Sequence, residues 1–276
     1  MDAAVIERIR TIQSAKHSVL CVGLDPDPAR LPPHLLAQYA LPDAIRAFQR
    51  AIIAATAPFA CAFKVNFAFY EALGADGWTL LSEARAQMPA DTLAIADAKR
   101  GDIGNTARFY ARSIFEQLGY EAITVAPYMG RDAVLPFLEH AGTLTFVLAR
   151  TSNPSGTDLQ TLQADGRPIY QQVAHHVAQW NQDAPGQAGL VAGATQPDDV
   201  RALRAACPSL PFLIPGVGAQ GGDPIAIMDA AQTAEGLVLV NSSRSILYAS
   251  RGPNFADHAA QQAASLATAL GPPTAA

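Results

Sequence analysis

The sequence predicts an α/β protein: a (β/α)8 TIM barrel that forms a single domain over residues 1–276. Eight short β-like runs alternate with longer helix-like segments from one end of the chain to the other. Most of the short runs are continuously apolar, as expected for parallel strands that are buried on both faces. No break in composition marks a second domain. A doubly wound open sheet is the alternative that this alternation leaves open.

The expected strands are short and separated by similar lengths of chain. In order they are Ser18–Leu24, Cys61–Val65, Thr92–Ala96, Ala122–Val125, Leu144–Ala149, Gly189–Ala192, Phe212–Ile214 and Leu237–Val240. The expected helices are Ala3–Ser14 before the first strand, then Pro42–Ala57, Tyr70–Gln87, Thr106–Leu118, Arg131–His140, Pro168–Gln182, Pro197–Ala206, Pro224–Thr233 and, after the last strand, Phe255–Leu270.

Two segments fall outside this alternation. Ser152–Arg167 is polar and contains glycine and proline, so it is expected to be a long loop after the fifth strand. Long loops in compact domains are often lids or binding loops. The tail Gly271–Ala276 is expected to fray.

Composition excludes several classes of protein. The net charge is −5 and the pI is about 5.6, which excludes a generally basic surface for nucleic acid. The longest apolar stretch, Ala51–Phe63, is shorter than the ~18 residues of a membrane span. The three cysteines, Cys21, Cys61 and Cys207, show no metal-binding spacing, so we expect no metal site. Because a disulfide framework is not expected either, the predicted location is the cytoplasm.

Polar residues collect where the predicted strands end, which in a barrel is the end that carries the active site. A single charge after a strand usually marks only where the chain reaches the surface. Here the pattern recurs after six strands, and this recurrence predicts a functional site. The residues are Asp25, Lys64, Asn66, Asp97, Lys99, Asp102, Arg150, Ser152, the segment 216–220 and the segment 241–244.

The segment after the third strand is the most informative. Asp97 and Lys99 are two residues apart, so on an extended backbone they point to the same face, and Asp102 follows in the loop. With Lys64 from the second strand, two cations alternate with two anions. Charges arranged in this way can share a partly buried site, because each has an opposite neighbour. A structural network of ion pairs at the barrel rim is the alternative interpretation.

A glycine-rich segment follows the seventh strand. Residues 216–221 match G-x-G-x-x-G, but no dinucleotide-binding half follows and the next strand carries no acidic residue at its tip. A phosphate cradle fits better, because Gly218, Gly221 and Gly222 let backbone N–H groups approach an anion and Arg244 adds a cation. Phosphate sites after strands seven and eight recur in such barrels. A glycine-rich turn without a ligand is the alternative.

Together these motifs resemble the orotidine 5′-phosphate decarboxylase family. The resemblance rests on D-A-K-R-G-D-I at 97–103, F-K-V-N at 63–66, P-G-V-G-A-Q-G-G-D at 215–223 and R-S-I at 244–246. The segments around 127–130 and 150–154 are similar to those of a longer bacterial subgroup. The chain departs from many relatives at Ser243 and Gly104, where they have Gly and Pro.

The resemblance implies a homodimer that converts orotidine 5′-phosphate to UMP and CO2 without a metal or an organic cofactor. It assigns Lys64, Asp97, Lys99 and Asp102 to the catalytic charge array. It places Asp102, Ile103 and Thr106 across the dimer interface. It also implies substrate-binding residues, namely Asp25 and Asp102 at the ribose, Ser152 at the pyrimidine, Pro215 and Val217 along the base, and Gln220 and Arg244 at the phosphate.

The expected chemistry places negative charge on C6 of the pyrimidine, which has no adjacent electron sink. A protonated Lys99 near C6 is expected to stabilise this charge and then to deliver the proton. Three other functions stay open at this point. They are a metal-dependent sugar-phosphate decarboxylase or epimerase, a Schiff-base aldolase using Lys64 or Lys99, and a nucleotide-binding protein without activity.

Overall fold

The computed structural model describes residues 4–182, 184–218 and 221–272. Its centre is a closed barrel of parallel strands, in the order β1-β10-β9-β8-β5-β4-β3-β2. The barrel strands are β1 (Leu20–Leu24), β2 (Ala62–Asn66), β3 (Leu93–Arg100), β4 (Ala122–Val125), β5 (Leu144–Arg150), β8 (Gln187–Ala192), β9 (Phe212–Pro215) and β10 (Val238–Ser242). The predicted (β/α)8 fold class is therefore confirmed.

Closure of the sheet excludes the open doubly wound alternative. Cys21 on β1 pairs with Ala62 on β2 on one side and with Asn241 on β10 on the other, so β1 has no free edge. The same closure excludes a Rossmann sheet as the setting of the glycine-rich segment.

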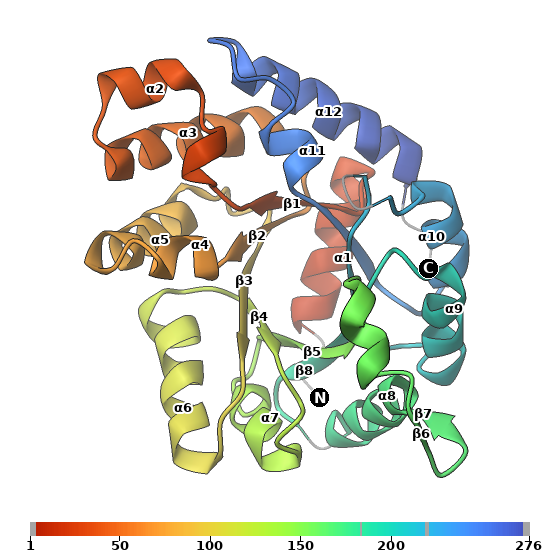
Figure 1. Cartoon of the computed structure of the whole chain (residues 1–276). Coiled ribbons are helices and arrows are strands. Elements are labelled where there is room, and N and C mark those ends of the chain that lie inside the picture. The colour runs from red at the N-terminus through yellow and green to blue at the C-terminus, as the bar shows by residue number, and fades with distance from the viewer. Residues whose placement is uncertain (1–3, 183, 219–220, 273–276) are drawn as a thin grey trace.

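Helices cover the outside of the barrel (Figure 1). They are α3 (Leu41–Thr56), α5 (Ala75–Gln87), α6 (Gly104–Arg112), α7 (Arg131–Leu138), α8 (Ile169–Trp180), α9 (Pro197–Ala206), α10 (Pro224–Ala231) and α12 (Phe255–Leu270). Local sequence explains where α9 and α10 begin. Each has proline in its first turn, which suits a position whose N–H needs no partner, and Asp223 caps α10 by accepting from Ile225 N.

One helix closes the amino end of the barrel. Helix α1 (Ala4–Lys16) buries Val5, Ile9 and Ile12 against side chains that fill the barrel interior. The Gln13 amide donates to the backbone oxygen of Val238 at 2.6 Å, which ties the helix to the start of β10. With the amino end covered, the carboxyl ends of the strands remain for a site.

Several predicted boundaries are wrong. The helix expected over Tyr70–Gln87 is two helices, α4 (Ala68–Glu71) and α5, because the chain reverses at Gly74 with φ +64°. Gly77 then packs so closely on Tyr70 that a Cβ on Gly77 would lie 1.7 Å from the backbone oxygen of Tyr70. In the helix expected over Thr106–Leu118, α6 ends at Arg112 and a π-helical turn continues to Gln117.

Short elements were also missed. Helices α2 (Pro33–Gln38) and α11 (Arg244–Leu247) were not predicted. The loop expected over Ser152–Arg167 contains a 3-10 turn (Pro154–Asp158) and a hairpin of β6 (Gln163–Ala164) with β7 (Arg167–Pro168). Positions 273–276 of the predicted frayed tail lie outside the described residues.

None of the helices that the structure describes is long and apolar enough to cross a membrane.

Candidate active site

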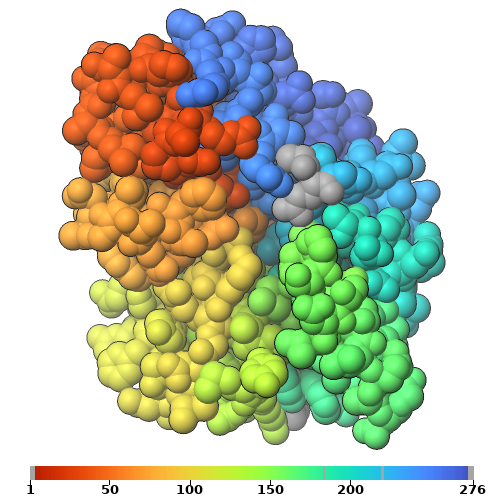
Figure 2. Space-filling model, viewed as in Figure 1, coloured from red at the N-terminus to blue at the C-terminus, as the bar shows by residue number. Residues whose placement is uncertain are grey.

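A cavity of about 610 Å³ opens among the carboxyl ends of the barrel strands. Seen from this end, the surface is hollowed between the segment around β3 (yellow) and the segment after β5 (green), as Figure 2 shows. The cavity is lined by eight of the twelve residues that the resemblance assigns to catalysis or substrate binding, namely Asp25, Lys64, Asp97, Lys99, Ser152, Pro215, Val217 and Arg244. The motifs thus place most of the assigned residues at one cavity.

The centre of the cavity is a cluster of alternating charges. Lys64 Nζ lies 2.8 Å from Asp97 Oδ2, and Lys99 Nζ lies 2.6 Å from Asp97 Oδ1. Lys64 and Asp97 are buried, whereas about half of the Lys99 side chain is exposed to the cavity. Asp97 therefore holds a buried ammonium in place on one side and a reachable ammonium on the other.

These ion pairs decide the protonation of the buried groups. Burial alone would raise the pKa of Asp97, but the positive charges of Lys64 and Lys99 outweigh it and hold that pKa well below its usual range. Burial alone would lower the pKa of Lys64, but Asp97 and Asp25 raise it above its ordinary value. Asp97 is thus a carboxylate and Lys64 an ammonium near neutral pH.

The backbone at Lys99 is not extended, so the geometric reason given for its pairing with Asp97 is wrong. Lys99 has φ +46°, and the register between β3 and β4 shifts between Ala96 and Arg100. A positive φ is strained for a residue with a side chain and persists only where the surroundings hold it. Here Thr124 on β4 holds it, because its Oγ1 accepts from Lys99 N at 3.0 Å and donates to Asp97 Oδ1 at 2.9 Å.

Three predicted site residues lie outside the cavity of their own chain. Asp102 accepts from the neighbouring Ile103 N and forms no ion pair with any residue in the described ranges. Ile103 and Thr106 are exposed at the start of α6. The single chain therefore does not assemble the four-residue array, and the position of these residues across a dimer interface stays a prediction.

The glycine-rich segment turns sharply at the edge of the cavity. Gly216, Gly218 and Gly221 have φ of +108°, +83° and +87°, which only glycine adopts without strain. Arg244 lines the cavity, and its guanidinium has no hydrogen-bond or ion-pair partner among residues 4–182, 184–218 and 221–272. An unpaired guanidinium beside such a turn suits an anionic ligand. The predicted ligand Gln220 lies outside the described residues.

Ser243 is accommodated by a glycine on the neighbouring strand. A Cβ on Gly23 would lie 1.9 Å from Ser243 Oγ, so the absence of a side chain at position 23 gives the serine its space. The departure from Gly at position 243 is thus matched on β1.

Sequence reasoning missed Thr124 and Tyr248 in the cavity, and it named Asn241 only as part of the segment 241–244. Asn241 is buried on β10, and its Oδ1, like Oδ1 of Asp25 in the loop after β1, has no hydrogen-bond partner in the part of the chain that is described. Tyr248 Oη donates to the backbone oxygen of Asp25 at 2.7 Å, which fixes the loop after β1. Thr124 could have been found as a polar residue inside an otherwise apolar strand.

No group of three or more His, Cys, Asp or Glu side chains that could hold a metal ion occurs within the described residues.

Fold and site together define an enzyme of the (β/α)8-barrel class, with a Lys–Asp–Lys array and an unpaired arginine at the carboxyl ends of its strands. A family model described as "Orotidine 5'-phosphate decarboxylase / HUMPS family" matches residues 18–258. The chain belongs to this family, as the sequence motifs predicted.

Proteins that are similar to this chain over nearly all of its length are named for the same activity. A Dehalococcoides mccartyi protein named orotidine 5′-phosphate decarboxylase is 45% identical over 270 residues, which is 96% of each chain. One from a Roseiflexus species with that name is 48% identical over 256 residues, or 92% of each chain. The solved structure of Leishmania donovani OMP decarboxylase has a TM-score of 0.80 at 36% identity and covers 96% of this chain and 99% of that one.

Proposed function

We propose that this chain is an orotidine 5′-phosphate decarboxylase, a carboxy-lyase that converts orotidine 5′-phosphate to UMP and CO2 in pyrimidine biosynthesis. The observation that carries the proposal is the buried Asp97 carboxylate held between the Lys64 and Lys99 ammonium groups, in a chain that belongs to this family. Relatives at 45% and 48% identity with this name support it.

Lys99 is the group that acts on the reacting carbon. Breaking the bond between C6 and the carboxylate leaves an electron pair on C6, and a fixed ammonium beside C6 stabilises that charge as it develops. The same ammonium then donates its proton to C6. The half-exposed side chain of Lys99 is free to reach a bound pyrimidine, which supports this role over the buried Lys64.

Asp97 holds Lys99 and repels the departing carboxylate. Two unit charges 4 Å apart interact by about 4 kcal/mol at an effective dielectric near 20. Destabilisation of bound substrates usually contributes only ~1–5 kcal/mol, so stabilisation by Lys99 is the larger contribution.

The remainder of the cavity supplies binding groups for a nucleotide. Arg244 and the turn at 216–222 bind the phosphate, and Gln220 is assigned to the same site by its motif. The Oδ1 atoms of Asp25 and Asn241, which have no hydrogen-bond partner among the described residues, are acceptors for ribose hydroxyls. Ser152, Pro215 and Val217 line the part of the cavity assigned to the pyrimidine.

A second copy of the chain completes the array. Asp102, Ile103 and Thr106 lie beside an exposed apolar group on α6 and on the loop after β4, which contains Phe109, Tyr110, Tyr128 and Met129. Exposed apolar residues gathered in this way are typical of a protein interface. In the proposed homodimer, each chain inserts the residues from 102 to 106 into the cavity of its partner.

The first test follows the ultraviolet absorbance of orotidine 5′-phosphate mixed with purified, EDTA-treated protein. We expect a rapid change, because the proposed chemistry needs neither a metal nor an organic cofactor. Absence of any change, with and without metal restored, would refute the proposal. A change only after metal is restored would favour the sugar-phosphate class of mechanism.

Two other expectations accompany this function. Both lysines are ion-paired to Asp97, and the pKa of Lys64 is raised by Asp97, which disfavours a Schiff base at that lysine. Borohydride with substrate is therefore expected to trap no adduct. Cytoplasmic localisation rests on the cysteines: Cys21, Cys61 and Cys207 are all buried free thiols.

A further inference from the structure

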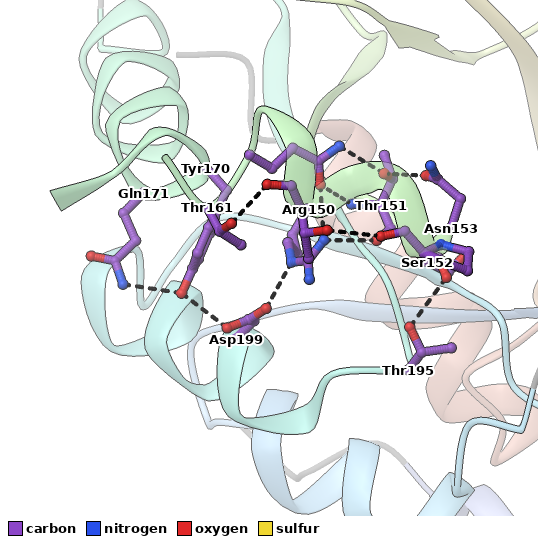
Figure 3. Close-up of polar contacts among 12 residues, drawn as sticks. Arg150, Thr151, Ser152, Asn153, Thr161, Tyr170, Gln171, Thr195 and Asp199 are labelled. Carbon is purple, nitrogen blue, oxygen red and sulfur yellow. Dashed lines mark hydrogen bonds and ion pairs between the residues drawn. The ribbon is translucent and has the colours of Figure 1, made fainter. Parts of the chain in front are cut away.

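An ion pair between a buried arginine and a partly exposed aspartate connects the end of β5 to the start of α9, beside the cavity. The Arg150 side chain is 4% exposed, and its Nε donates to Asp199 Oδ2 at 2.7 Å. Tyr170 Oη on α8 donates to the other oxygen, Asp199 Oδ1, at 3.2 Å. Both carboxylate oxygens are therefore engaged, which fixes the orientation of the acceptor for Arg150 (Figure 3).

The guanidinium reaches from this ion pair into the segment after β5. Arg150 Nη1 donates to Gln160 Oε1 at 3.1 Å. Gln160 in turn holds Thr151 by two bonds, because its Oε1 accepts from Thr151 N at 3.0 Å and its Nε2 donates to Thr151 Oγ1 at 2.7 Å. The residue that precedes Ser152 is thus held on its backbone and on its side chain.

Two glycines allow this close packing. A Cβ on Gly156 would lie 2.9 Å from both Arg150 Nη1 and Gln160 Oε1, and a Cβ on Gly193 would lie 2.7 Å from Ser152 N. Thr195 Oγ1 also donates to the backbone oxygen of Ser152 at 3.3 Å. Ser152 is therefore held by its neighbour Thr151, by the close approach of Gly193 and by Thr195.

We propose that Arg150 is a positioning residue that fixes Ser152 against the nucleobase by way of Gln160. This inference rests on the proposed function, which assigns Ser152 to the pyrimidine. The segment after β5 is then a preorganised part of the binding site, already ordered in the free enzyme, and does not act as a lid. Groups that are already ordered lose less entropy on binding, so the bonds they make to the base count more fully toward affinity.

The burial of Arg150 supports a positioning role. Its guanidinium loses its water, and this cost offsets much of its attraction to Asp199, whose side chain is 27% exposed, so the pair contributes little net stability. What Arg150 adds is geometry: one rigid guanidinium bonds to a carboxylate on α9 and to an amide in the segment after β5. Lysine at this position would keep the charge but lacks the planar fork that serves both partners.

The test compares two ligands that share the phosphate site. UMP carries the nucleobase, and ribose 5-phosphate does not. In Gln160→Met, which removes both bonds to Thr151, we expect the Kd of UMP to rise about tenfold, as the loss of about one well-placed hydrogen bond would cause. The Kd of ribose 5-phosphate is expected to stay within about twofold, since Gln160 shares no hydrogen bond with Arg244 or with the described part of the glycine-rich turn.

A second pair of variants separates positioning from folding. The double variant Arg150→Met with Asp199→Asn removes the ion pair without leaving a lone buried charge, and it is expected to show the same selective loss. The single variant Arg150→Lys is expected to bind UMP more weakly than the wild type but more tightly than the double variant.

Two controls are matched to these variants. Arg201→Ala breaks an exposed ion pair with Asp198 on the same helix. Ser18→Ala removes a buried bond to the Phe59 oxygen at the amino end of the barrel, so it lowers stability away from the cavity. Both controls are expected to keep the wild-type ratio of the two Kd values.

The inference is overturned if Gln160→Met and the double variant keep the wild-type ratio of the Kd of UMP to the Kd of ribose 5-phosphate. It is also overturned if both Kd values rise by the same factor. If the wild-type protein itself binds UMP no more tightly than ribose 5-phosphate, the proposed function fails, and the positioning role falls with it. The wild-type measurement therefore distinguishes the two failures.

Discussion

Lys99→Ala removes the ammonium that the proposed chemistry depends on and leaves the Asp97–Lys64 ion pair intact. An ammonium about 3 Å from the developing charge on C6 stabilises it by about 5 kcal/mol at an effective dielectric near 20. Since about 1.4 kcal/mol corresponds to a factor of ten in rate, loss of this interaction lowers kcat by about 10⁴. Loss of the proton donor lowers it by a further ~10²-fold or more.

The assay is the absorbance change of orotidine 5′-phosphate, together with the Kd of UMP for the same protein. We expect turnover in Lys99→Ala to be nearly abolished while UMP binding remains detectable, because Arg244 and the turn at 216–222 are unchanged. Lys16→Ala is the matched control, since Lys16 is paired to Asp91 and lies on α1 at the closed end of the barrel. This control is expected to keep wild-type kcat.

The reasoning would be refuted by a Lys99→Ala protein that retains more than about one hundredth of wild-type kcat, because no effect of the size worked above would then act through Lys99. A variant that loses UMP binding as well would instead assign Lys99 to substrate binding. Wild-type Tm in the variant distinguishes both results from misfolding.

Three further predictions concern the other charged residues. Arg244→Ala is expected to raise KM far more than it lowers kcat, because phosphate binding is shared by the ground and transition states; steady-state kinetics checks this, and unchanged KM with low kcat would contradict it. Asp97→Asn is expected to cost about 3 kcal/mol in urea unfolding at neutral pH, because it leaves buried Lys64 unpaired. Folding lowers the pKa of Asp97, so the stabilisation by its carboxylate is present above the unfolded pKa near 4 and is lost as pH falls through the folded pKa. The difference in unfolding free energy between wild type and Asp97→Asn should therefore disappear in acid and not at pH 6–8. Mixed Lys99→Ala and Asp102→Ala chains are expected to regain about a quarter of the sites after subunit exchange, and no recovery would argue against a shared site.

The order of elements could be predicted because the parallel strands of this barrel are buried on both faces. Runs such as 122–125 and 144–149 are apolar apart from one threonine each, and the helices 197–206 and 255–270 were predicted with the bounds they have. The break between α4 and α5 occurs at Gly74, where φ is +64°, and a close contact between the two helices accompanies it. Gly77 packs on the Tyr70 oxygen, and nothing in the local helical pattern of 70–87 signals that approach.

The site could be predicted at the level of strand ends but not of backbone detail. Asp97 and Lys99 meet as expected, although through a positive φ that Thr124 on the next strand supports. Arg150 was noted only as one more charge after a strand. Its partners Gln160 and Asp199 are ten and forty-nine residues away, and such pairings follow from the packing of whole elements.

The position of Asp102 carries the argument for a second chain. A charged residue on the surface of a monomer is not expected to stand among exposed apolar residues. Ile103, just before α6, is nevertheless 56% exposed, and Phe109 on α6 is 62% exposed. Meanwhile Lys99 keeps about half of its side chain accessible and has Asp97 as its ion-pair partner in the described chain. An interface that buries Ile103 and Phe109 would gain hydrophobic free energy. The same contact would bring the carboxylate of Asp102 towards the open side of Lys99 in the partner. Dimerisation would then also complete the charge array. Protein that is diluted until the dimer dissociates is therefore expected to lose its activity.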